Sequence, residues 1–137
     1  FHSNGYSLVR KVLDSNTSNC LVSNEEALIP TKIYVTKILD LIDKHPIKGI
    51  AHITGGGFEE NLERIIPKNI DINILKWEIP SIFKNLQKMG NIKDDEMYRV
   101  FNMGIGMVVI SDSKIDDSEL IFLGKTERGS GKVSIQK

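Results

Sequence analysis

Three consecutive glycines, Gly55 to Gly57, interrupt the chain where a short apolar run gives way to a helical pattern. The run from Ile47 to Thr54 predicts a short strand, and apolar residues recur at helical spacing from Phe58 to Ile66, just before Pro67. A glycine turn in this position lets backbone N–H groups approach an oxygen-rich ligand, and the unpaired donors of the following helix favour a phosphate. The alternative is a tight turn that needs only positive φ angles, and the glycines alone do not separate the two interpretations.

Two polar residues lie at the end of the predicted strand. His52 and Thr54 place polar side chains where ligands of open α/β sheets commonly bind. His52 could orient a substrate or act as an acid or base near neutral pH, while a structural hydrogen bond is the alternative that the residue alone favours. His45 precedes Pro46 at the predicted end of a helix, where the helix dipole accounts for it, and we assign it no function.

The composition limits the class of protein. A chain of 137 residues that is 40% hydrophobic suits a single domain with its own core. Its 18 basic and 18 acidic residues balance, so no overall field attracts nucleic acid or an anionic membrane. The single Cys20 excludes an internal disulfide, and no apolar run approaches the roughly 20 residues that span a bilayer, so we expect a cytoplasmic protein. Because the chain begins at Phe1, without a methionine, we expect it to be part of a longer protein.

Hydrophobic periodicity predicts an α+β fold of the layered α/β kind, with helices packed on one mixed β-sheet. Helices are expected to begin near Tyr6, at Pro30 and Thr31, at Phe58, at Ile82 and at Asp94. Strands are expected at Ile47–Thr54, Ile70–Leu75, Asn102–Ile110, Leu120–Leu123 and Lys132–Gln136.

Local signals add detail to this outline. Ser3 or Asn4 is placed to cap the first helix, and the helix after Pro30 has an apolar face that would cover a sheet. The segment Thr126–Gly131 suits a hairpin turn between the last two strands. The acidic run Asp94–Glu96 is better explained as a partner of a helix dipole than as a metal site.

Five phrases of the sequence occur together in a known family. They are HSNGYSLVRK (2–11), PTKIYV (30–35), HITGGGF (52–58), WEIP (77–80) and EMYRVFNMGIGM (96–107). In this order they resemble the aminoimidazole ribonucleotide synthetases, also called phosphoribosylformylglycinamidine cyclo-ligases. The resemblance covers the carboxy-terminal domain of that family nearly end to end, and its amino-terminal half has no counterpart here.

The resemblance implies an ATP-dependent ligase of de novo purine biosynthesis, which converts formylglycinamidine ribonucleotide to aminoimidazole ribonucleotide. ATP and Mg²⁺ would be bound mainly by the amino-terminal half, while residues 1–137 form the single domain that closes over the substrate. The full-length enzyme would be a homodimer, and the chain alone would be inactive. The implied catalytic residues are His52 and His2, the implied substrate-binding residues are Ser3, Asn4, Gly5, Thr54, Gly55, Gly56, Gly57 and Asn102, and no metal ligand is expected in this chain.

Two other interpretations are kept. One is another member of the same ATP-dependent superfamily, a formylglycinamidine ribonucleotide synthetase or a selenophosphate synthetase, against which the WEIP and EMYR phrases argue. The other is a ligand-binding fragment without catalysis.

The chain departs from the family pattern in two places. The strand that leads into the loop at His2 is absent, and Ser111–Glu119 is a short polar segment where the family carries a helix. We therefore expect an uncovered sheet edge or face, with self-association of the fragment near Gly104–Ile110.

Overall fold

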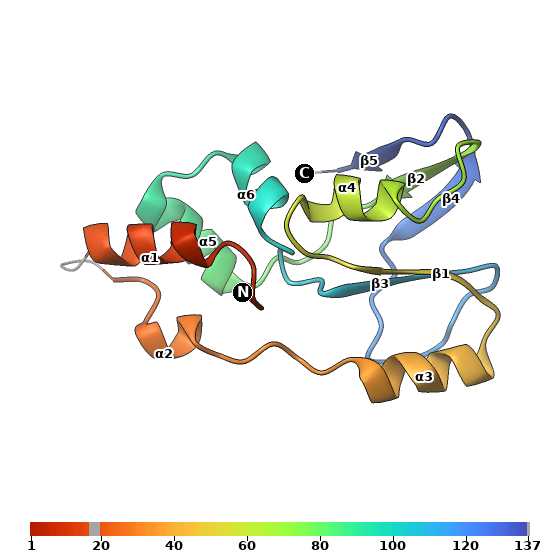
Figure 1. Cartoon of the computed structure of the whole chain (residues 1–137), viewed down its shortest axis with the longest axis horizontal. Coiled ribbons are helices and arrows are strands. Elements are labelled where there is room, and N and C mark those ends of the chain that lie inside the picture. Colours follow the sequence, from red (N-terminus) through yellow and green to blue (C-terminus); the bar gives the residue numbers. More distant parts are fainter. Residues whose placement is uncertain (17–19, 137) are drawn as a thin grey trace. The chain divides into compact units, whose positions relative to one another are not determined.

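The computed structural model describes residues 1–16 and 20–136, and it confirms the α+β class. The chain forms two compact units, each built from separate stretches of sequence (Figure 1). The first unit comprises Phe1–Lys32, Ile53–Phe58 and Glu78–Gly106, and the second comprises Ile33–His52, Glu59–Trp77 and Met107–Lys137. Within the described residues, no helix is both long and apolar enough to cross a membrane.

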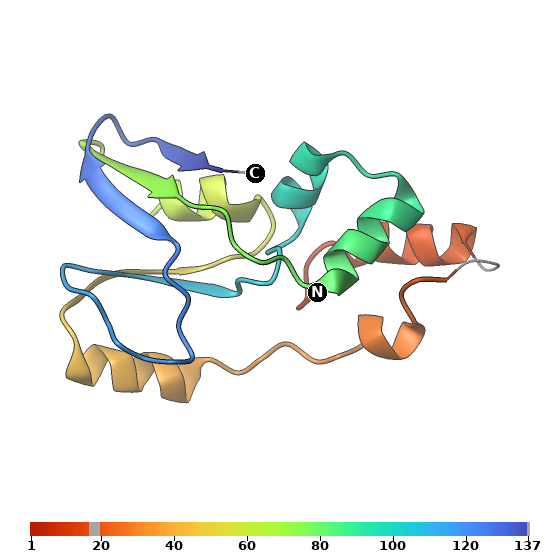
Figure 2. The same cartoon turned by 180° about the vertical axis from the view of Figure 1, so that it is seen from behind.

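The first unit is helical. Its helices are α1 (Tyr6–Ser15), α2 (Asn24–Ala27), α5 (Ser81–Gly90) and α6 (Asp94–Val100). Helices α1 and α5 pack side by side, with Val9 and Val12 of α1 and Phe83 and Leu86 of α5 buried (Figures 1 and 2). The apolar spacing seen in the sequence therefore marks the core of this unit correctly.

The start of α1 differs from the expected cap. Gly5 is the capping residue, in a left-handed conformation with φ 72°. The start of the helix therefore has no side-chain hydrogen bond from its capping residue. The predicted cap by Ser3 or Asn4 is therefore wrong, because the amide of Asn4 is used elsewhere. A capping box does occur at α2, where Ser23 and Glu26 exchange hydrogen bonds of 2.9 and 3.1 Å.

The second unit holds two small sheets. Its elements are α3 (Val35–Lys44), β1 (Ile47–His52), most of α4 (Gly57–Glu63), β2 (Ile70–Ile74), β3 (Met107–Ser111), β4 (Gly124–Arg128) and β5 (Val133–Ile135). β1 pairs antiparallel with β3, while β2 lies between antiparallel β4 and parallel β5 (Figure 2). The expected single mixed sheet is thus two sheets, of which the three-stranded one is mixed.

Three expectations for the carboxy-terminal strands are wrong. Leu120–Leu123 is not a strand, since the strand begins at Gly124. Residues 126–128 of the expected hairpin turn belong to β4, and β4 and β5 do not pair with each other because both pair with β2. The strand predicted from Asn102 begins only at Met107, because Asn102 to Ile105 form a turn closed by a 2.9 Å backbone hydrogen bond.

Helix α3 begins at Val35 rather than at Pro30 and Thr31. Leu41 is buried on its inner side, but Val35, Leu39 and Ile42 are 63%, 56% and 46% exposed. These three residues are spaced at i, i+4 and i+7, so they form one apolar stripe on the outside of the helix. The helix therefore buries only part of the apolar face that the sequence assigns to the covering of a sheet.

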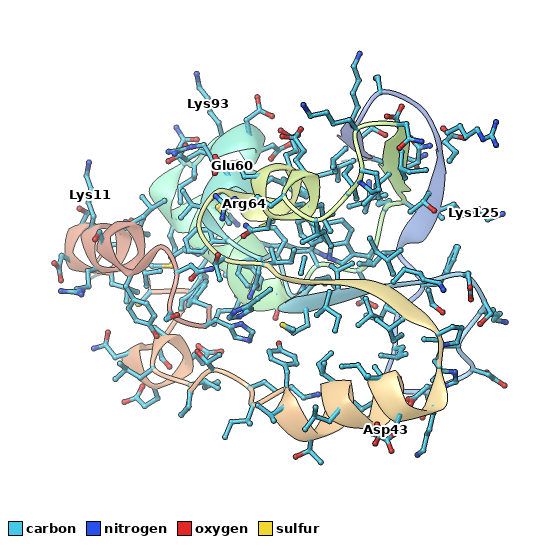
Figure 3. All side chains as sticks on the ribbon, turned by 45° about the vertical axis from the view of Figure 1, so that its right-hand side comes forward. Lys11, Asp43, Glu60, Arg64, Lys93 and Lys125 are labelled. Atoms are coloured by element: carbon cyan, nitrogen blue, oxygen red, sulfur yellow. The ribbon has the colours of Figure 1, made fainter. Side chains whose placement is uncertain are left out.

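Charged side chains lie on the outer surface of both units, beside exposed apolar ones. Lys11, Asp43, Lys93 and Lys125 are exposed and point away from the ribbon (Figure 3). Glu60 and Arg64, which follow the start of α4, form an exposed ion pair of 3.4 Å. Such exposed pairs contribute little to stability, so packing rather than surface charge must hold α4.

The carboxylate of Asp71 in β2 holds the connection between β4 and β5. Its Oδ1 accepts backbone N–H groups of Lys132 at 2.8 Å and of Ser130 at 2.7 Å. These hydrogen bonds, with that of Lys132 the larger influence, hold the pKa of Asp71 below its usual value.

We expect Asp71→Asn to destabilise the protein near neutral pH, because a neutral amide is a weaker acceptor than the carboxylate. A lowered folded-state pKa means that the carboxylate stabilises the fold above its unfolded-state pKa, and that this stabilisation is lost as the pH falls through the folded-state pKa. Urea unfolding of parent and variant across the acidic range should show a gap that closes at low pH. Asp116→Asn, at an exposed loop residue, is the control; a gap for Asp71→Asn that persisted at low pH would contradict the assignment.

Candidate functional site

Three loops of the first unit meet at one place. They are residues 2–5 before α1, residues 53–57 at the start of α4, and residues 99–104 at the end of α6 and beyond it. Three hydrogen bonds join them: Asn4 Nδ2 donates to the Ile53 carbonyl at 3.4 Å, the Gly56 N–H donates to the Arg99 carbonyl at 3.1 Å, and Asn102 Nδ2 lies 3.1 Å from His2 Nδ1. The unit thus brings together predicted site residues that are about 50 and 100 positions apart.

Asn102 is the buried polar residue of this site. Asn102 is 2% exposed, and its side-chain Oδ1 accepts a hydrogen bond from the Gly104 N–H at 3.0 Å. Its Nδ2 faces the half-buried His2. Among the described residues, no buried side-chain nitrogen or oxygen lacks a hydrogen-bond partner, so the polar groups enclosed here are satisfied.

The backbone on both sides of this hydrogen bond is strained. His2 has φ 54° and Met103 has φ 48°, in the left-handed region that side chains other than glycine rarely adopt. The third described non-glycine residue of this kind is Asn91, which ends α5, where a left-handed residue is common. Strain of this sort costs roughly 1–3 kcal/mol per residue and persists only where the surroundings hold it, which is frequent at functional sites.

An aromatic cluster supports the loops. The rings of Phe1, Phe83 and Phe101 lie with centroids 5.2 to 5.9 Å apart. Phe101 also packs directly on Gly5, where a Cβ would be only 2.4 Å from Phe101 Cε1. Residue 5 must therefore be glycine for its contact as well as for its positive φ, and this contact fixes the loop that carries His2.

The tight-turn interpretation of the glycine loop holds at Gly57. A Cβ on Gly57 would lie 1.9 Å from the Tyr98 carbonyl oxygen, and its φ is +65°, so packing alone requires this glycine. The N–H groups of Gly56 and Gly57 donate to Arg99 and Thr54 within the protein. Gly55 is different, because it is exposed and no heavy atom lies within 4 Å of a Cβ built there. Folding gives no steric reason for glycine at position 55.

The remaining predicted residues are placed as follows. Ser3 is exposed and Thr54 is half-buried, both within the loops described above. His52 belongs to the second unit, so it is not among the residues that the first unit brings together. There it is exposed at the end of β1, with its ring centroid 6.4 Å from that of Tyr34, whose pKa is raised by burial.

Sequence reasoning missed several residues that shape the site. Phe101 and the carbonyls of Tyr98 and Arg99 lie in the EMYRVFNMGIGM phrase, which identified the family without assigning them a role. The left-handed conformation of Met103 has no sequence signal, since methionine does not favour it. Only the neighbouring Gly104, with φ +97°, marks a turn at this point.

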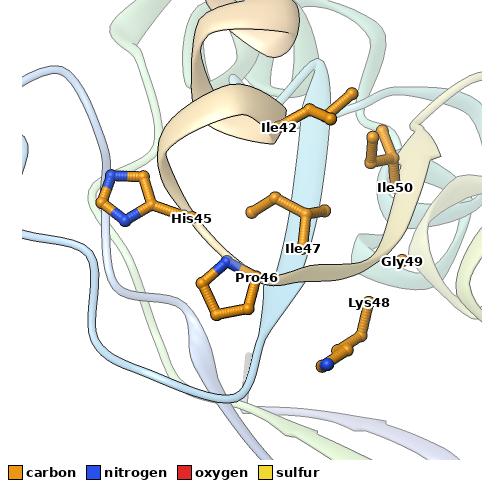
Figure 4. A pocket seen from close by; sticks show the side chains of 7 residues that line it. All are labelled: Ile42, His45, Pro46, Ile47, Lys48, Gly49 and Ile50. Carbon is orange, nitrogen blue, oxygen red and sulfur yellow. The ribbon is translucent and has the colours of Figure 1, made fainter.

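Two hollows lie elsewhere in the units. One, of about 330 Å³, lies in the second unit after α3 and is lined by Ile42, His45, Pro46, Ile47, Lys48, Gly49 and Ile50 (Figure 4). Another, of about 380 Å³, lies in the first unit and is lined by Tyr6, Val9, Arg10, Leu13, Asn24, Ala27 and Leu28. None of the predicted site residues lines either hollow. Across residues 1–16 and 20–136, no three His, Cys, Asp or Glu side chains are grouped to hold a metal ion.

Comparisons with known proteins agree with the phrases of the sequence. Residues 1–118 match the family model described as AIR synthase related protein, C-terminal domain. Three curated relatives share the name phosphoribosylformylglycinamidine cyclo-ligase. The one from Alkaliphilus oremlandii is 49% identical over 90% of this chain and 40% of its own length, that from Neisseria gonorrhoeae 47% over 89% and 38%, and that from Lactococcus lactis subsp. cremoris 53% over 79% and 34%. The chain thus spans between about a third and two fifths of the length of these relatives.

Two substitutions in the glycine loop should have opposite effects on stability. Gly57→Ala should lower the free energy of unfolding by at least the roughly 1–3 kcal/mol of a strained left-handed residue, because its methyl group also meets the Tyr98 carbonyl. Gly55→Ala, the matched control two residues away, should leave stability equal or raise it slightly. Chemical denaturation of both variants measures this, and equal midpoints would show that the loop does not pack as described.

Proposed function

Since the chain belongs to the family of AIR synthase related protein C-terminal domains, we propose that it forms the substrate-holding part of a phosphoribosylformylglycinamidine cyclo-ligase. Residues 1–137 act in this proposal as the single carboxy-terminal domain of a longer enzyme. The substrate is formylglycinamidine ribonucleotide, and the reaction forms the C–N bond that closes the imidazole ring. The enzyme acts in the cytoplasm as a homodimer, as the family resemblance implies.

The observation that carries the proposal is the meeting of three loops in the first unit. Each contains one of the phrases that identified the family, and their contacts hold His2, Asn4 and Asn102 in defined positions. His2 and Met103 retain strained backbone at this place, where the structure gains no obvious stability from it. A preorganised arrangement of polar groups is what binding of a small polar substrate requires.

The residues have distinct roles in this proposal. Ser3, Gly5 and the exposed Gly55 lie where a ribonucleotide phosphate or ribose can approach the backbone, and Asn4 ties their two loops together. His2 contacts the polar part of the substrate, and Asn102, for which the resemblance implies a part in substrate binding, contributes through its hydrogen bond to His2. The family resemblance also implies a catalytic role for His52, which lies at the end of β1 in the second unit.

ATP and Mg²⁺ are assigned to the amino-terminal part of the full-length enzyme. Magnesium prefers carboxylate and phosphate oxygens, and the described residues do not offer a carboxylate cluster that fits it. The nucleotide, when bound, activates the formyl oxygen as a leaving group. No step of this reaction is therefore assigned to a metal ligand of this chain.

The proposal predicts that the chain closes no ring by itself but does so as part of a full-length enzyme. The test replaces the matching segment of the Alkaliphilus oremlandii relative with residues 1–137 and measures ATP-dependent consumption of formylglycinamidine ribonucleotide. Activity of the chimera together with inactivity of the chain is expected. Ring closure by the chain alone, or a folded chimera without activity beside an active parent, would overturn the proposal.

A second prediction uses the exposed Gly55 of the glycine loop. In the active chimera, Gly55→Ala should raise KM for the ribonucleotide about tenfold or more, because its methyl group occupies space open to a ligand and displaces a charge-assisted hydrogen bond of roughly 1.5–3 kcal/mol. The same substitution should leave the unfolding midpoint unchanged or higher. Gly129→Ala cannot serve as the control, because a Cβ at this exposed glycine would clash with the side chain of Asp71. Ser118→Ala, in an exposed loop, is used instead, and an unchanged KM in Gly55→Ala would remove the glycine loop from the site.

A further inference from the structure

We propose that Asn102 fixes the tautomer of His2, so that the neutral ring carries its proton on Nε2 and acts as a hydrogen-bond donor. The assignment of the tautomer rests on hydrogen-bond geometry within the first unit. Only the identity of the acceptor, an oxygen of the ribonucleotide substrate, rests on the function proposed above. Asn102 is then a positioning residue that acts through His2 and not a residue that binds substrate itself.

The first step is the orientation of the Asn102 amide. The Gly104 N–H, 3.0 Å from this amide, is a backbone donor and has no acceptor capacity. The atom facing it must therefore be the amide oxygen, Oδ1. The NH₂ group of the amide consequently faces His2, and the opposite flip of Asn102 would place two donors against each other.

The second step is the protonation of the His2 ring. Asn102 Nδ2 lies 3.1 Å from His2 Nδ1, and because Nδ2 is a donor, Nδ1 must accept. An Nδ1 that accepts a hydrogen bond carries no proton. In the neutral imidazole the proton is then on Nε2, since one ring nitrogen donates while the other accepts.

Neither partner can easily rotate away. Asn102 is 2% exposed, and its backbone carbonyl accepts a hydrogen bond from the Ile105 N–H at 2.9 Å, which closes the turn. Gly104 is held against Pro80, where a Cβ would be 2.5 Å from Pro80 Cδ. On the other side, Phe1 in the aromatic cluster precedes His2 and fixes the backbone from which the ring extends.

The tautomer decides what His2 can do. With a proton already on Nε2, the ring cannot take a proton there, so it does not serve as a base at that atom. It can donate a hydrogen bond to a carbonyl or phosphate oxygen without bringing a full positive charge into the site. The role of His2 that follows is to orient or polarise a substrate oxygen.

The test is the proton position on the ring, read from the nitrogen chemical shifts of the chain labelled with ¹⁵N-histidine. Above the titration range of histidine, the His2 signal, identified by its loss in His2→Gln, should show the Nε2–H tautomer. In Asn102→Asp a carboxylate replaces the NH₂ group and accepts from Nδ1, so the preferred tautomer should change to Nδ1–H. Asn91→Asp is the matched control, because it adds the same charge at an exposed residue whose φ of 47° aspartate tolerates.

Each outcome decides the proposal. Nδ1–H in the parent protein, or an unchanged tautomer in a folded Asn102→Asp variant, overturns it. If that variant does not fold, the parent spectrum alone still decides, because an even mixture of tautomers also contradicts the geometry.

A separate measurement tests the link to the proposed function. In the full-length enzyme, His2→Ala should lower kcat/KM at least about tenfold, while His2→Gln, which keeps an N–H donor, should retain more activity. Unchanged kcat/KM in both variants beside a confirmed tautomer would reject the role in the site and leave the tautomer standing.

Discussion

The site depends on the close approach of two backbone segments in the first unit. The carbonyl of Tyr98 occupies the space where Gly57 would carry a Cβ, and the next carbonyl, of Arg99, accepts the Gly56 N–H. This contact fixes the end of α6 against the start of α4. The chain that follows α6 continues to Phe101, which packs on Gly5, and to Asn102, which lies beside His2. A glycine that packing requires at position 57 thus lies at the contact between two of the loops that carry the polar groups of the site.

Much of the candidate site could be predicted from the sequence, because histidine, asparagine and glycine in loops are distinct signals. His2, Asn4, Gly56 and Asn102 do converge, although they are far apart in the chain. Their individual roles could not be predicted, since each depends on a partner that no local pattern reveals. Asn4 caps no helix and instead ties two loops together, because Gly5 already supplies the left-handed cap. Backbone strain at Met103 is invisible in a sequence, since it is imposed by the turn and not by the residue.

Helices α1, α3, α4, α5 and α6 and the central strand β2 of the three-stranded sheet followed from periodicity, whereas the edge strand β4 did not. Ile72 and Ile74 of β2 alternate with polar residues and are buried as expected. β4, by contrast, has the sequence GKTER, with no apolar alternation, and it is a strand because its backbone pairs with β2. The strand was instead predicted at Leu120–Leu123 because Ile121 and Phe122 are apolar, but these two residues are 62% and 63% exposed. Pairing of backbones, rather than burial of side chains, decides an edge strand of this kind.

The stretches of the two units alternate along the chain, and this alternation determines when each unit can fold during synthesis. The first unit lacks its last stretch until Gly106 has been synthesised, and the glycine loop has no carbonyls to pack on until α6 exists. By then β1 has also left the ribosome, but its partner β3 begins only at Met107, and β4 and β5 follow later still. At a translation rate of roughly 5–20 residues per second, the nascent chain spends several seconds with these segments unpaired. The first unit therefore cannot complete its folding until Gly106 has been synthesised, and no single cut in the chain yields two pieces that each contain a complete unit.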